Sequence, residues 1–185
     1  MNWALSETQL GVLAAAAITV FWMVGGYNRL VALRTGLGAA YAQVDELLQR
    51  RGAAVQALVT ALRAPLVGES GALDALLAAQ AQVAGAADAL RARPVMASHA
   101  AALMAAESLM SSSASRVLAL VEQHPALAGA PDIAPPLATL HELPTRLGFA
   151  RQLYNDAAAT YNAAARQFPT RLLTRLYGFG TAGRL

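Results

Sequence analysis

The sequence predicts an all-α protein: an N-terminal transmembrane helix, then an antiparallel helical bundle of about four long helices plus a short C-terminal helix. Residues 8–28 form an apolar run without charge between Glu7 and Arg29. Beyond this run, apolar residues recur at spacings of three and four, which is the period of one helix face. Val and Ile are scattered and form no alternating run, so no strand is predicted.

Residues 8–28 are long enough to cross a bilayer. At about 1.5 Å per residue, a helix of about 21 residues spans roughly 30 Å, the thickness of the hydrocarbon core. Trp3, Trp22 and Tyr27 lie toward its ends, where aromatic rings favour the headgroup level. A buried core helix would have a polar face, and a signal peptide would open with positive charge, whereas Glu7 is the only charged side chain before the run. We therefore expect an uncleaved anchor.

The charges that flank the anchor predict its orientation. Arg29, Arg34, Arg50 and Arg51 follow it, and no arginine precedes it. The positive-inside bias then predicts a single-pass protein of the cytoplasmic (inner) membrane, with its N-terminus outside and its bundle in the cytoplasm.

The anchor is expected to continue, as one helix, to Leu62. Its apolar stripe comprises Leu30, Leu33, Leu37, Tyr41, Val44, Leu48, Val55, Leu58 and Leu62. Gln43, Asp45 and Arg50 lie largely off this stripe, and Asp45 with Glu46 has the pattern of a solvated acidic face. Arg51 falls nearer the stripe, so we expect its stem to lie along the core while its charged head reaches water.

A break is predicted at residues 65–71, where Pro65, Gly68 and Gly71 follow closely. A second helix then runs to Pro94 and a third covers about 95–124. The apolar face of the third helix carries Glu107 and three methionines, Met96, Met104 and Met110. Such methionines can form an adaptable groove or a metal site, but core packing is the preferred interpretation.

Residues 126–136 are predicted to be the longest loop, because they contain Gly129, Pro131, Pro135 and Pro136. A last long helix begins near Leu137, and Pro144 should kink or restart it. Its face comprises Leu147, Ala150, Tyr154, Ala157, Ala158, Tyr161, Ala165 and Phe168. A short final helix is expected over 171–177. The domain prediction is a tail (1–7), an anchor (8–28), a bundle (29–180) and a second tail (181–185).

Composition excludes several classes of function. All 14 basic side chains are arginines, they are dispersed, and 6% of residues are aromatic, so no nucleic-acid surface is predicted. The absence of cysteine excludes disulfides and thiol catalysis. His99, His124 and His141 are scattered, and no phosphate-binding loop or metal motif occurs. We expect no catalytic residues, no metal and no cofactor, and therefore no enzyme.

Two blocks of sequence, one near each end of the chain, form a recognisable pattern. The first block includes Tyr27-Asn28-Arg29-Leu30, Gln43-Val44-Asp45 and Arg50-Arg51; the second includes Phe149-Ala150-Arg151, Tyr154-Asn155, Tyr161-Asn162 and Phe168-Pro169. In these blocks the chain resembles the LemA family, a group of bacterial membrane-anchored helical proteins. The family usually has Trp where Tyr41 stands. The resemblance implies an N-terminal membrane helix and an antiparallel bundle, and it implies no known enzymatic activity.

The shared polar residues predict a seam between the first and last helices of the bundle. Its candidate members are Gln43, Asp45, Arg50, Arg51, Arg151, Tyr154, Asn155, Tyr161 and Asn162. Buried Tyr and Asn side chains need hydrogen-bond partners, so we expect contacts such as Asp45 to an Asn, or Arg151 to a carboxylate. Alternatively, this seam faces a groove that binds a partner.

These observations leave three functional hypotheses open. The first is a membrane-tethered interaction or scaffold protein, which binds the bilayer through residues 8–28 and other proteins through its helices. The second is a protein that self-associates at the membrane surface. The third is a bundle with a small ligand between its helices, near the methionines.

Overall fold

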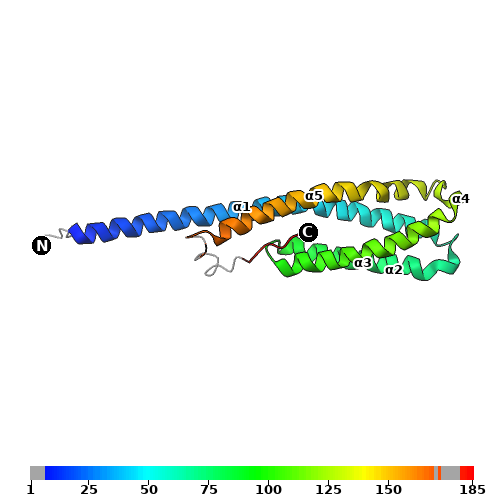
Figure 1. The fold of residues 1–185 in the computed structure, drawn as a ribbon, viewed down its shortest axis with the longest axis horizontal. Coiled ribbons are helices and arrows are strands. Elements are labelled where there is room, and N and C mark those ends of the chain that lie inside the picture. Colours follow the sequence, from blue (N-terminus) through cyan, green and yellow to red (C-terminus); the bar gives the residue numbers. More distant parts are fainter. Residues whose placement is uncertain (1–6, 169–170, 172–179) are drawn as a thin grey trace.

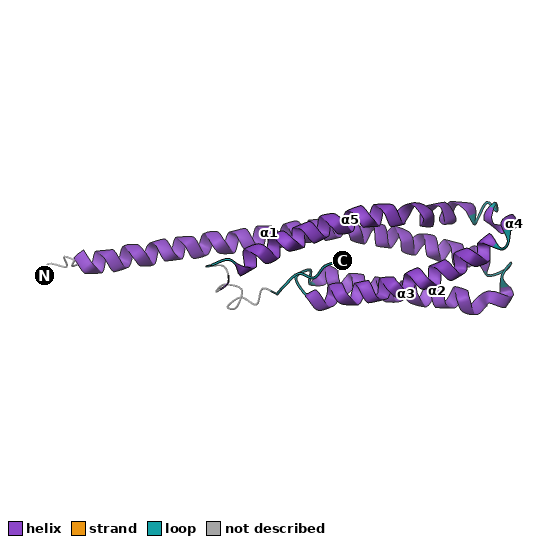
Figure 2. Ribbon diagram, in the orientation of Figure 1, coloured by secondary structure: helices purple, strands orange, loops and turns teal. Residues whose placement is uncertain are grey.

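A computed structural model describes residues 7–168, 171 and 180–185. Over these residues the chain is helical and contains no strand, which confirms the predicted all-α class. The elements are α1 (Glu7–Leu62), the 3-10 turn η1 (Val67–Glu69), α2 (Ser70–Ala92), α3 (Ala97–Glu122), α4 (Pro125–Ala128) and α5 (Ala134–Arg166), shown in Figures 1 and 2.

Helix α1 is a single uninterrupted helix of 56 residues, as predicted. At about 1.5 Å per residue it is roughly 84 Å long. Its N-terminal part projects beyond the other helices (Figure 1), and large apolar side chains there, such as Phe21 at 81%, are exposed. From Leu30 onward the predicted stripe enters the core, and Leu30, Leu37, Val55, Leu58 and Leu62 are fully buried.

The bundle consists of two helix pairs. Helix α1 packs along α5, α2 packs along α3, and α1 also contacts α2 (Figure 1). Helices α3 and α5 face each other with few close backbone approaches. Side chains and residues 180–185 therefore occupy the space between these two helices, and this space contains most of the features described below.

The last part of the chain differs from the prediction in several places. Helix α4 lies within the predicted loop, and α5 begins at Ala134, so Pro135 and Pro136 stand in its first turn. Proline is favoured there because the first turn of a helix has no partners for its N–H groups. Helix α5 also continues through Pro144, so the restart predicted there as one alternative was wrong, and the other alternative, a kink, stays a prediction. Of the predicted helix 171–177, all but Arg171 lies outside the described residues.

The end of α5 lies beside the part of α1 that projects from the bundle. The rings of Trp22 and Phe168 meet edge to face, with centroids 5.4 Å apart, and Arg29 donates a hydrogen bond to the Gln167 side chain at 3.2 Å. Phe168 is 71% exposed, so its predicted place in the core was wrong. It packs against the exposed ring of Trp22 instead.

Candidate functional site

The structure separates the residues of the predicted seam. Asp45 binds α2, and Arg51 and Arg151 meet on α3. Asn155, Tyr161 and Asn162 bind residues 180–185, whereas Tyr154 donates to Pro94 O at 3.4 Å. Gln43 and Arg50 are exposed. The predicted contact of Asp45 with an Asn is thus replaced by other partners, because α1 and α5 pack directly through apolar side chains.

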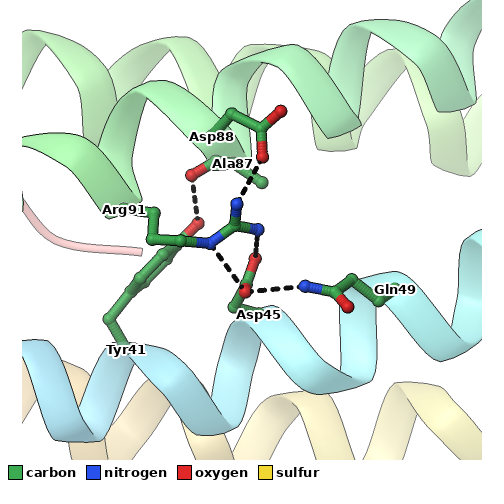
Figure 3. Close-up of polar contacts among 6 residues, drawn as sticks. All are labelled: Tyr41, Asp45, Gln49, Ala87, Asp88 and Arg91. Atoms are coloured by element: carbon green, nitrogen blue, oxygen red, sulfur yellow. Dashed lines mark hydrogen bonds and ion pairs between the residues drawn. The ribbon is translucent and has the colours of Figure 1, made fainter.

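Asp45 joins α1 to α2 through Arg91 (Figure 3). Arg91 Nε and Nη2 donate to the two carboxylate oxygens of Asp45 at 2.9 and 2.6 Å, and Gln49 Nε2 donates to Asp45 Oδ2 at 2.9 Å. Arg91 Nη1 also donates to Asp88 at 2.6 Å. The hydrogen bonding of Arg91 to the Asp45 carboxylate raises the pKa of Arg91. Asp45 is 7% exposed, so the predicted solvated acidic face was wrong for this residue.

Tyr41 reinforces the same contact between α1 and α2. Its hydroxyl donates to the Ala87 carbonyl at 2.9 Å (Figure 3). Its ring meets that of Tyr154 edge to face at 5.9 Å, a favourable geometry for two aromatic rings. Burial raises the pKa of Tyr41, so the hydroxyl remains a donor throughout the neutral range. Tyr41 and Tyr154 therefore connect α1, α2 and α5 at one level of the bundle.

Glu107 on α3 is the centre of a second cluster. Arg51 from α1 forms two hydrogen bonds with its carboxylate, one from Nη1 at 3.0 Å, and Arg151 from α5 forms a third. The Glu107 side chain is 8% exposed. Burying a charge is costly unless it is paired and hydrogen-bonded, and two guanidinium groups supply this pairing. The cluster joins three helices, and the predicted contact of Arg151 with a carboxylate is present on α3.

The asparagines of the two Tyr–Asn pairs bind the backbone of the C-terminal segment, residues 180–185. Asn162 Nδ2 donates to Ala182 O at 2.8 Å, and Ala182 N donates to Asn162 Oδ1 at 3.0 Å. Asn155 makes the equivalent pair with Leu185, at 2.7 and 2.8 Å. Tyr161 adds a hydrogen bond from its hydroxyl to Gly180 O at 3.1 Å.

The seven-residue spacing of the asparagines matches the spacing of the residues that they bind. Seven residues of helix rise about 10.5 Å, and three residues of extended chain cover roughly 10 Å. Asn155 and Asn162 therefore hold Leu185 and Ala182 only while the segment between them is nearly extended. The two asparagines bind backbone groups of residues 182 and 185, so these hydrogen bonds do not depend on the side chains at those positions.

Glycines let the C-terminal segment approach α3 closely. A Cβ atom on Gly183 would lie 2.6 Å from Ala100 Cβ and 3.0 Å from Ala97 Cα. A Cβ on Gly180 would lie 2.4 Å from Val95 O. Ala182 between them is 6% exposed and belongs to the core. Residues 181–185, which we expected to form a tail, thus pack between α3 and α5.

Sequence analysis did not single out Glu107 or Arg91 as functional or structural centres. The role of Glu107 could have been predicted from the sequence. It is the one acidic residue on the apolar face of the third helix, and a buried carboxylate needs a basic partner. Arg91 lies in the last turn of α2, where basic residues are favoured by the helix dipole, so its position alone does not indicate the contact with Asp45. Within the described residues, no three His, Asp or Glu side chains gather at a spacing that would hold a metal ion.

Comparison with known proteins agrees with the resemblance seen in the sequence. A family model described as the LemA family matches residues 40–184, which cover the bundle and the C-terminal segment. No curated protein sequence matches the chain. Since the family model matches most of the chain, this protein belongs to the LemA family.

Proposed function

We propose that this protein is a single-pass membrane-anchored interaction protein without catalytic activity. One observation carries the proposal: an exposed apolar segment continues, without a break, into the central helix of a packed bundle. The described part of the chain contains one helix that is long and apolar enough to cross a membrane. Exposing this apolar surface to water would cost free energy, whereas the hydrocarbon core of a bilayer would bury it.

Aromatic residues support a membrane boundary near the base of the bundle. Trp22, Tyr27 and Phe168 are exposed at 53%, 39% and 71%, and they lie where α5 ends beside α1. Such rings favour the headgroup region, and Arg29 follows directly. The bilayer would therefore contain the apolar run of α1, residues 8–28, with the end of this run near Tyr27 and the base of the bundle in the headgroup layer.

The buried charges support an architectural role. Asp45 is bound by Arg91, and Glu107 is bound by Arg51 and Arg151, so both carboxylates are engaged in joining helices. The bundle would present its exposed helix faces to other proteins, including further copies of this chain. By the positive-inside bias, the arginines after the anchor favour a cytoplasmic position for this bundle.

Cysteine labelling in intact cells tests the proposed topology, because the chain has no native cysteine. Ser6→Cys and Gln123→Cys would be treated separately with a thiol reagent that cannot cross the membrane. Gln123 suits this purpose because it is exposed, whereas Ala182 is buried. Labelling at position 6 alone is expected. Labelling at position 123 would reverse the orientation, and subsequent cross-linking would then search for partners on the outer face.

A second candidate function, a ligand bound between helices, is favoured by a specific observation. Met104 and Met110 line a cavity of about 440 Å³ between α3 and α5. Met110 is fully packed, as predicted, but Met104 is 38% exposed at this cavity. The cavity lies within the bundle. A ligand bound there would regulate an interaction protein, so this second function is compatible with the first.

A further inference from the structure

The cavity between α3 and α5 has the size and lining of a small-molecule site. Its volume of about 440 Å³ falls in the range of known ligand sites, which runs from about 300 to 1,000 Å³. Its apolar lining includes Met104, Met110, Leu118, Leu140, Pro144 and Leu147.

The cavity exists because α3 and α5 make few close backbone approaches, which leaves space between them. Toward the membrane end of the bundle, the C-terminal segment fills the space between them, with Gly183 against Ala97 and Ala100. Glu107 and its arginines then bridge the two helices. Beyond this cluster the space continues as the cavity, between residues 108–118 of α3 and 140–147 of α5.

Positive charge lies at one end of this cavity. Arg51 and Arg151 line it and share the single carboxylate of Glu107, so the cluster retains one positive charge. Arg51 Nε is buried and has no hydrogen-bond acceptor among the described residues. An unsatisfied buried donor is costly, so movement of Arg51 toward a second acceptor would be favourable. The hydroxyls of Ser108, Ser111 and Ser115 line the same cavity and add further polar groups.

We propose that this cavity binds a water-soluble organic monoanion with a compact apolar body. Its acid group would bind Arg51 and Arg151, which hold a carboxylate well because the guanidinium presents paired donors. Its apolar body would contact Met104, Leu140 and Leu147, and a flexible methionine adapts to different shapes. This inference names the ligand class for the second candidate function and does not rest on the membrane-anchored role.

The ligand should come from the aqueous phase rather than from the bilayer. Arg51 lies about 23 residues beyond the end of the apolar run, which corresponds to roughly 35 Å along α1. A lipid held in the bilayer would not reach this level of the bundle. A soluble carboxylate would enter at the exposed side of Met104 and Ser111.

Isothermal titration with 2-naphthoate tests the proposal. The full chain would be held in phosphatidylcholine nanodiscs, and the heat from empty nanodiscs would be subtracted. The matched neutral probe is 2-naphthylmethanol, which has the same ring system without the charge. One naphthoate should bind per chain, and the alcohol should bind at least about tenfold more weakly, a difference of about 1.4 kcal/mol.

Variants that fill the cavity localise the binding. Ala114 lines the cavity, so Ala114→Trp should abolish naphthoate binding, whereas Ala105→Trp at an exposed position of the same helix should leave it unchanged. Ser115→Trp is a second filling variant, and circular dichroism would establish which variants fold. Absent binding, equal binding of the two probes, or undiminished binding to a folded filling variant would overturn the proposal. None of these results depends on the topology experiment, so the two proposals fail separately.

Discussion

Asn162 holds Ala182 by both polar groups of its backbone, with hydrogen bonds of 2.8 Å to the carbonyl and 3.0 Å from the amide. An asparagine side chain offers one donor and one acceptor in the same plane, so it pairs with an extended backbone much as a neighbouring strand would. Asn155 repeats this contact at Leu185. Three of the four Tyr and Asn side chains in these pairs, Asn155, Tyr161 and Asn162, therefore bind a segment of the chain's own C-terminal region.

Replacing Asn162 should release the middle of this segment. Asn162→Ala removes two hydrogen bonds, each worth about 1 kcal/mol, so the Ala182 amide should exchange with solvent roughly tenfold faster or more. Hydrogen exchange followed by mass spectrometry would measure this. Thr160→Ala is the control, because its hydroxyl bonds only to Asp156 O within α5. Unchanged protection at Ala182 would count against the contact.

A side chain at position 183 should displace the segment from α3. In Gly183→Val the new Cβ would overlap Ala100 Cβ and Ala97 Cα, both held in the helix backbone, so the melting temperature and the protection of residues 182–185 should both fall. Gly85→Ala in α2 is the matched control. No atom lies within 4 Å of a Cβ there, and alanine in a helix should stabilise the protein by about 0.5–1 kcal/mol. Similar effects from the two substitutions would contradict the close packing of Gly183.

Glu107 should matter more for stability than other acidic residues of α3. Glu107→Gln leaves Arg51 and Arg151 without the charge that compensates them, and breaking such a buried pair costs about 3–5 kcal/mol. Denaturant unfolding of the full chain in nanodiscs would measure the loss. Glu122→Gln, at an exposed position of the same helix, should change the free energy of unfolding by less than about 0.5 kcal/mol. A comparable loss in both variants would argue against the cluster.

Buried tyrosines should make the bundle sensitive to alkali. Burial raises the pKa of Tyr154 from 10.0 to about 12, so the folded state keeps this proton when the unfolded state has lost it. Stability is therefore full below pH 10 and falls as the pH rises toward 12. Tyr154→Phe should reduce this loss by about 1 kcal/mol at pH 11. Unfolding measured at pH 8 and pH 11 in both proteins would check it, and identical pH dependence would refute it.

The helices could be predicted because a helix depends mainly on residues that are close together in the sequence. The stripe from Leu30 to Leu62 repeats with the helix period, and the core residues follow it closely. A restart of the helix at Pro144 was one predicted alternative, because proline disfavours a helix interior by about 3 kcal/mol. Helix α5 instead continues through Pro144, with Leu143 and Leu147 buried close to it.

The partners of the polar residues could not be predicted, because they depend on how the helices meet. Asn155 and Asn162 suggested buried amides, and the sequence contains many possible acceptors for them. Their actual partners lie 30 and 20 residues downstream, in a segment without helix or strand periodicity. Arg91 and Asp45 are likewise separated by 46 residues. Only the arrangement of α1, α2 and α5 brings these groups together.

Membrane extraction with alkaline carbonate tests whether residues 8–28 anchor the protein. The double variant Leu13→Arg/Val20→Arg places two charges in the apolar part of α1, each costing about 2.5 kcal/mol or more in a bilayer. Its control, Ala102→Arg/Ala105→Arg, adds the same charge at exposed positions of α3. The parent and the control should remain in the membrane pellet while the anchor variant is released. Release of the parent, or retention of the anchor variant, would contradict the account.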